Sequence, residues 1–158
     1  MTRDRSLSGV AGWLRFLVII IFIGGALHIL VSIGGLEWKD LERESPELIY
    51  HSGFQNFQMA DRVVGFLSGA VLLYAGFLLL KRKVIGTVIS VKLIIGVVFP
   101  FLILVRYIVS PYLFLGMPPS EALAVDSDIP KDIARTFIWA AIWVSYLHRS
   151  DRVKNTYQ

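Results

Sequence analysis

Five ionisable residues lie inside or at the edges of long apolar stretches of the chain: His28, Asp61, Arg62, Lys92 and Arg106. A charged side chain at the centre of a bilayer costs at least about 2.5–3.5 kcal/mol, so such residues often mark ligand sites or proton relays. Histidine also changes its protonation near neutral pH, which suits a relay. These five residues are therefore the candidates for a ligand-binding or relay site.

Two interpretations of these residues stay open. His28, Asp61, Arg62 and Arg106 all fall toward one predicted membrane boundary, where they would converge into one polar cluster. Alternatively, the last three anchor helix ends and His28 bonds to a neighbouring helix. Lys92 lies about nine residues into its own apolar stretch, so its ammonium group either extends to the inner headgroups or faces the protein interior.

Other chemistries find no support in the sequence. The chain has no cysteine, and its three histidines lie at different predicted depths, so we predict no metal site. It carries no glycine-rich phosphate loop and no credible catalytic Ser-His-Asp set, so we predict no enzyme and no cofactor. The net charge is +4, but the basic residues adjoin apolar stretches, which is typical of membrane proteins and argues against nucleic-acid binding.

The elements that must position these residues are four apolar stretches, at residues 13–36, 63–80, 84–109 and 130–147. The chain is 55% hydrophobic and its mean hydropathy is +0.63. Crossing a bilayer takes about 20 residues of helix, and peptide groups inside lipid must bond within their own helix. We therefore predict an all-α fold in which residues 1–158 form a single domain, a four-helix transmembrane bundle.

Charge patterning predicts the orientation of this bundle. Acidic residues dominate residues 37–61 and residues 121–128, whereas basic residues gather in the remaining loops and tails. The basic residues concerned are Arg3, Arg5, Lys81, Arg82, Lys83, Arg149, Arg152 and Lys154. Because basic loops stay on the cytoplasmic side, both termini are predicted to be cytoplasmic. Within the first outer loop, residues 40–60 form either a short amphipathic helix on the membrane surface or a plain loop.

Small residues and a proline give weaker packing signals. Gly65 and Gly69 form a Gly-xxx-Gly pair, which predicts a closely packed neighbour for the second helix. Pro100 should kink the third helix or loosen one of its turns.

The two ends of the chain carry a distinctive pattern. Residues 12–14 read Gly-Trp-Leu, residues 142–146 read Ile-Trp-Val-Ser-Tyr, and residues 150–157 read Ser-Asp-Arg-Val-Lys-Asn-Thr-Tyr. The pattern resembles a family of small bacterial inner-membrane proteins, domain of unknown function 2569, which usually has phenylalanine in place of Tyr157. That family also commonly has an acidic residue where Asp61 stands. The resemblance implies four helices in a bacterial cytoplasmic membrane, and it implies no activity.

The tail after the fourth stretch has two interpretations. Arg149, Arg152 and Lys154 can each gain about 1 kcal/mol from anionic headgroups, and Ser150 adds hydrogen-bonding capacity. These four residues either anchor the topology or form a docking segment for lipid or a partner protein.

We carry three functional hypotheses. The first is a non-catalytic accessory or scaffold protein that binds membrane lipids, another membrane protein or a second copy of itself. The alternative is a small oligomeric transporter or channel that uses Lys92, His28 and Arg106. The weakest is an enzyme acting on lipids, because no catalytic group has a visible partner.

Overall fold

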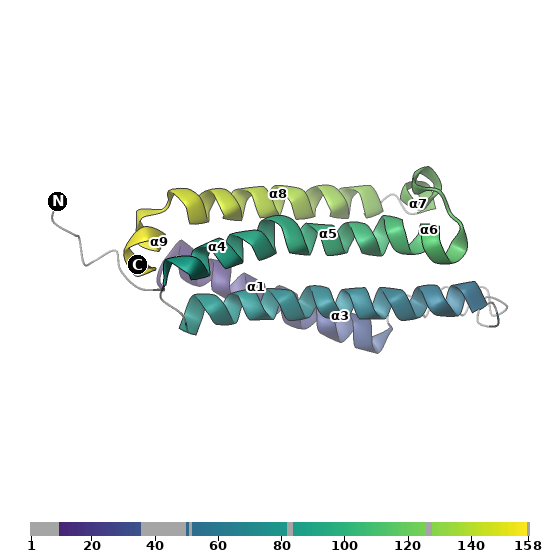
Figure 1. Ribbon diagram of the computed structural model, residues 1–158, viewed down its shortest axis with the longest axis horizontal. Coiled ribbons are helices and arrows are strands. Elements are labelled where there is room, and N and C mark those ends of the chain that lie inside the picture. The colour runs from purple at the N-terminus through teal and green to yellow at the C-terminus, as the bar shows by residue number, and fades with distance from the viewer. Residues whose placement is uncertain (1–9, 36–49, 51, 82–83, 126–127, 158) are drawn as a thin grey trace.

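The described part of the chain is almost entirely helical and contains no β-strand. The computed structural model describes residues 10–35, 50, 52–81, 84–125 and 128–157. The helices lie side by side in an elongated bundle (Figure 1). They are α1 (Trp13–Gly34), α3 (Ser52–Lys81), α4 (Ile85–Leu93), α5 (Phe99–Leu104), α6 (Ser110–Leu115), α7 (Pro119–Val125), α8 (Asp128–Arg149) and α9 (Asp151–Thr156). The prediction of an all-α fold is confirmed.

The third predicted helix is a continuous rod that contains two π-helical segments. The segment η4 (Ile94–Val98) joins α4 to α5, and η5 (Val105–Val109) joins α5 to α6. Each segment ends two residues before a proline, Pro100 or Pro111. Proline has no N–H to donate and its ring crowds the carbonyl four residues earlier, so a wider turn at that point relieves the conflict. The expected loosened turn before Pro100 is therefore present.

The rod runs to Leu115, beyond the predicted end at residue 109, because the second π-helical segment also accommodates Pro111. The chain then turns at Gly116, whose φ of 67° is the left-handed conformation that glycine adopts most readily at a helix end. This extension places all of η5, with Arg106, well inside the helix.

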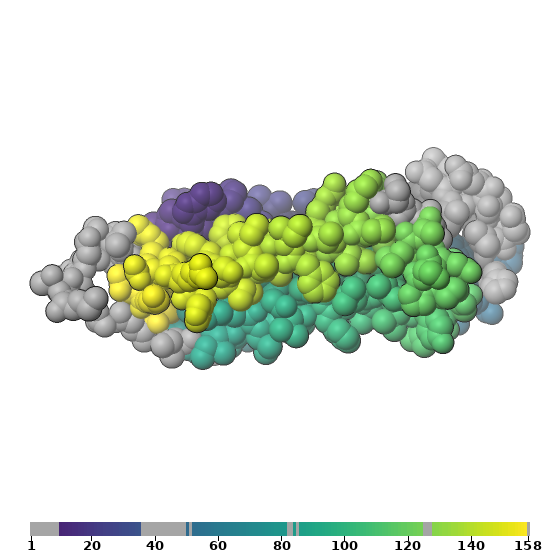
Figure 2. Space-filling model, turned by 90° about the horizontal axis from the view of Figure 1, so that it is seen from above, coloured from purple at the N-terminus to yellow at the C-terminus, as the bar shows by residue number. Residues whose placement is uncertain are grey.

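Within the described residues, three helices are long and apolar enough to cross a membrane: Trp13–Gly34, Ser52–Lys81 and Gly86–Leu115. These helices indicate a membrane protein. The helix α8, the fourth predicted span, is less apolar because Lys131, Asp132 and Arg135 occupy its first turns. It nevertheless packs along α4, η4 and α5, and the space-filling view shows it beside this part of the rod (Figure 2).

The second predicted helix begins earlier than expected. Hydropathy placed its start at residue 63, but α3 begins at Ser52 and continues without a break. Residues 52–60 therefore extend this helix and do not form a separate surface helix, while residues 40–49 of that prediction lie outside the described residues. The extension is held by Phe54 and Phe57, which are buried on the same face as Asp61.

The core lies where α1, α3, α8 and the rod meet. The helix α1 packs closely on α3, with Gly25 facing Gly69. The expectation of a closely packed neighbour for α3 is confirmed, because small residues let two backbones approach. The start of α1, the end of α3, the start of α4 and α9 lie at one end of the bundle, and α6 and α7 lie at the other (Figure 1).

Candidate functional site

An ion pair is buried where α3 meets η5. The Arg106 Nε donates to Oδ1 of Asp61 at 2.6 Å, and Nη2 donates to Oδ2 at 3.0 Å. Asp61 is 4% exposed and Arg106 is 3% exposed. Two parallel hydrogen bonds between a guanidinium and a carboxylate form the strongest common geometry for such a pair. The structure thus brings together two of the five predicted polar residues.

A third helix closes around this pair. Gly65 lies one turn after Asp61, and a Cβ atom built on it would lie 3.7 Å from Cζ of Arg106 and would collide with Oγ of Ser32. The Ser32 hydroxyl donates to the carbonyl of His28 at 2.6 Å. Side chains from α1, α3 and η5 therefore meet at one buried point. The guanidinium also lies 5.6 Å from the ring centroid of Tyr107, within the range of cation–π attraction.

The remaining predicted residues lie outside this pair. The ring of His28 packs edge to face on Phe99, with centroids 5.5 Å apart, so it meets the pair only through its backbone carbonyl and Ser32. The exposed Arg62 lies beside Gly35, where a built Cβ would be 2.9 Å from Nη2. Lys92 is half-buried and lies about 21 Å from Arg106 along the rod, at 1.5 Å per residue. The predicted four-residue cluster is thus reduced to Asp61 and Arg106 as direct partners.

The basic tail folds as the short helix α9. The Ser150 Oγ caps it by accepting a hydrogen bond from the Val153 N–H at 3.4 Å. The exposed Lys154 pairs with Asp151 at 3.3 Å, one turn apart. Arg152 lies against the start of α1, because a Cβ built on Gly12 would be 3.9 Å from its Nε. Arg149 is exposed at the end of α8.

Comparison with known proteins gives one match. A family model described as a protein of unknown function (DUF2569) matches residues 7–158. The chain belongs to this family. The resemblance to the DUF2569 family found in the sequence is therefore confirmed. No curated protein matches the chain, and no solved structure does.

Sequence reasoning missed the role of Tyr157, which stands where the resemblance gives phenylalanine. The Tyr157 hydroxyl donates to the carbonyl of Leu79 at 2.5 Å, and the residue is 1% exposed. Leu79 is two residues from the last residue of α3, among the final four carbonyls that an α-helix cannot satisfy internally. In this DUF2569 protein, Tyr157 therefore caps the C-terminal end of α3, although the two are far apart in the sequence. The hydroxyl that distinguishes Tyr157 from phenylalanine was the signal in the sequence for a hydrogen bond at this position.

Burial, with a smaller contribution from the phenol of Tyr146, raises the pKa of Tyr157 to about 12 from its ordinary 10.0. A raised pKa means that folding favours the protonated hydroxyl, the form that donates. The stabilisation linked to this protonation is therefore complete below about pH 10 and is lost as the pH rises through about 12.

Replacing Tyr157 by phenylalanine should loosen α9. The variant leaves the Leu79 carbonyl without its donor, which costs about 1 kcal/mol and makes opening of α9 about fivefold more frequent. Limited trypsin cleavage after Arg152 in detergent measures this opening, and Tyr112→Phe, at an exposed position of α6, is the matched control. Equal cleavage rates for wild type and Tyr157→Phe would show that the hydroxyl does not hold α9.

Proposed function

We propose that this DUF2569 protein is a four-span, non-catalytic accessory protein of the bacterial inner membrane, which binds lipids and other membrane proteins through its outer faces. One observation carries the proposal. Asp61 and Arg106 are buried inside the bundle and hydrogen-bond to each other. Groups that bind or transport a ligand must be reachable from water or from a pathway. The accessible chemistry of this chain therefore lies on its surface.

The distribution of the other polar residues supports an accessory protein over a transporter. A transport path would need Lys92, His28 and Arg106 to line one route. Lys92 and Arg106 are separated by about 21 Å along the rod, and the ring of His28 packs on Phe99. Within the described residues these side chains form no continuous polar line.

Helix length and packing support α8 as the fourth span. Its 22 residues reach about 33 Å, which exceeds a hydrocarbon core of about 30 Å. Its early charges are compensated in pairs one turn apart, Lys131 with Asp128 and Arg135 with Asp132. Exposed apolar side chains further along α8 would then face lipid, and they are Phe137, Ile138 and Ile142.

The charges at the two ends support an arrangement with both termini in the cytoplasm. Arg15, Lys81 and Arg149 lie at the end of the bundle that carries α9, while Glu121 and Asp128 lie at the opposite end. Basic residues favour the cytoplasmic side, so the end with α9 is assigned to the cytoplasm.

The absence of cysteine from the chain permits a direct test of this topology. Single cysteines introduced as Ser120→Cys at α7 and Lys154→Cys at α9 lie at opposite ends and at exposed positions. A maleimide that does not cross membranes should label Ser120→Cys in intact spheroplasts and Lys154→Cys only after lysis. Labelling of both before lysis, or of Lys154→Cys alone, would contradict four spans with cytoplasmic termini.

The accessory role predicts a stable partner. Extraction of native membranes into polymer nanodiscs, followed by mass measurement, should recover the chain with a stoichiometric membrane protein. Removing exposed cytoplasmic charges with Arg149→Ala and Lys154→Ala should lower that recovery severalfold, whereas Lys131→Ala with Arg135→Ala, at the other end of α8, should not. Recovery of the chain alone would count against the accessory role.

A further inference from the structure

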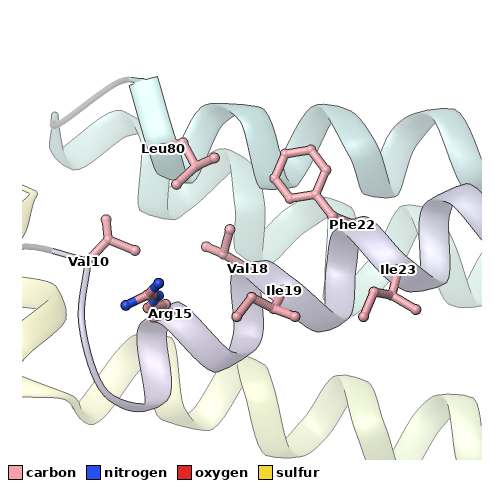
Figure 3. Close-up of a pocket in the computed structure, with 7 residues that line it drawn as sticks. All are labelled: Val10, Arg15, Val18, Ile19, Phe22, Ile23 and Leu80. Carbon is pink, nitrogen blue, oxygen red and sulfur yellow. The ribbon is translucent and has the colours of Figure 1, made fainter.

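An open groove lies on the outer surface between the first half of α1 and the end of α3. Its volume is about 390 Å³, and its lining is apolar except for Arg15. Val10, Val18 and Phe22 line it from the α1 side and Leu80 lines it from α3 (Figure 3). A groove with this lining suits a ligand that has an apolar part and an anionic group.

The cation in this groove is available to a ligand. Within the described part of the chain, Arg15 forms no ion pair, and its side chain is exposed. A guanidinium presents several N–H donors in a planar fork that matches two oxygens of a phosphate. Arg152 lies against Gly12 at the same end of α1, so a second guanidinium adds to the positive potential there.

The depth of the groove fits a phospholipid. Trp13 is 66% exposed and contacts the ring of Phe16 at 5.5 Å, an arrangement typical of aromatic residues at the headgroup level. Arg15 follows within the same turn. From Arg15 to Ile23, which also lines the groove, α1 descends about 12 Å at 1.5 Å per residue. The cation therefore lies at headgroup level and the apolar walls lie at the depth of an acyl chain.

From this match we infer that the groove binds an anionic phospholipid of the cytoplasmic leaflet, with its phosphate on Arg15 and one acyl chain between α1 and Leu80. The inference rests on the proposed orientation of the bundle and names one lipid that the accessory protein would hold. An anionic headgroup is favoured over a zwitterionic one because, among the described residues, no acidic side chain lines the groove.

Lipid retention after purification tests this site. Protein equilibrated in nanodiscs of equal parts phosphatidylglycerol and phosphatidylcholine is transferred to mild detergent, and the lipids that stay bound are measured by native mass spectrometry. Wild type should retain phosphatidylglycerol in preference to phosphatidylcholine. Arg15→Gln should lower retained phosphatidylglycerol about fivefold, the factor that corresponds to about 1 kcal/mol for a basic residue near headgroups. Arg135→Gln, which removes an exposed cation at the opposite end of the bundle, should leave retention unchanged.

A second variant keeps the test independent of charge. Ile19 lines the groove but is 46% exposed, so Ile19→Trp fills the groove without disturbing the buried core. This variant should also lose bound phosphatidylglycerol. Equal retention by wild type and both groove variants, or an equal loss in Arg135→Gln, would overturn the site. These outcomes are separate from the cysteine-labelling result, because retention in detergent does not depend on which end of the bundle is cytoplasmic.

Discussion

Replacing Asp61 by alanine is expected to lower the free energy of unfolding by about 3–5 kcal/mol, because the change leaves the guanidinium of Arg106 buried without its carboxylate. Two hydrogen bonds of 2.6 and 3.0 Å are lost at once, and water cannot replace them at a site this deeply buried. Unfolding of the purified protein in mixed micelles, titrated with sodium dodecyl sulfate, measures the loss.

Two further variants separate the ion pair from a general effect of removing charge. Glu121→Ala removes an exposed carboxylate at the same end of the bundle and should change stability by less than about 0.5 kcal/mol. Replacing both partners, as Asp61→Leu with Arg106→Met, should recover most of the lost stability, since a buried pair contributes little beyond an apolar pair of similar size. A double variant as unstable as Asp61→Ala would show that the pair has a role beyond mutual compensation.

Replacing Gly69 by alanine should separate α1 from α3. A Cβ atom at this position would lie 2.5 Å from the carbonyl oxygen of Gly25, 2.6 Å from Cγ1 of Ile29 and 3.0 Å from the Ile29 nitrogen. Two of these neighbours are backbone atoms, so the whole of α1 must move. Overpacking of this kind costs about 1–3 kcal/mol, and the same titration in micelles should show it.

The matched control for this change is Gly24→Ala in α1. A Cβ atom on Gly24 meets no atom within 4 Å, so the variant tests the effect of alanine in a helix without a clash. Alanine favours helix over glycine by about 0.5–1 kcal/mol, so Gly24→Ala should be neutral or stabilising. If Gly69→Ala were as stable as Gly24→Ala, the close approach of the two backbones would not limit this interface.

The helices could be predicted from the sequence because long apolar stretches leave few alternatives in lipid. The start of α3 could not be found by the same reasoning. The apolar stretch begins only after Asp61 and Arg62, whereas the helix begins earlier, at Ser52. A different signal was present. Phe54, Phe57 and Asp61 follow the i, i+3, i+7 spacing of one helix face, and all three are buried on it. Reading that spacing would have moved Asp61 from the helix start to its interior.

The partner of Asp61 was harder to identify from sequence. Arg106 lies between two prolines, and each π-helical segment changes the direction in which later side chains point. A regular helical wheel therefore misplaces Arg106 relative to α3. His28 shows a different case: it lies on α1 one turn before Ser32, but the ring turns to Phe99 and only its carbonyl reaches the site through Ser32. Hydropathy predicts the position of a residue along a membrane helix, whereas the direction of its side chain depends on packing.

The hydrogen bond from Tyr157 to Leu79 joins residues that are 78 positions apart in the chain. A ribosome adds about 5–20 residues per second, so roughly 4–16 s separate the synthesis of the acceptor from that of its donor. Throughout that interval the end of α3 is exposed to water at the membrane surface, and its carbonyls must bond to solvent. Completion of the end of the bundle that carries α9 is therefore a late event in biogenesis, after the rod and α8 have been made.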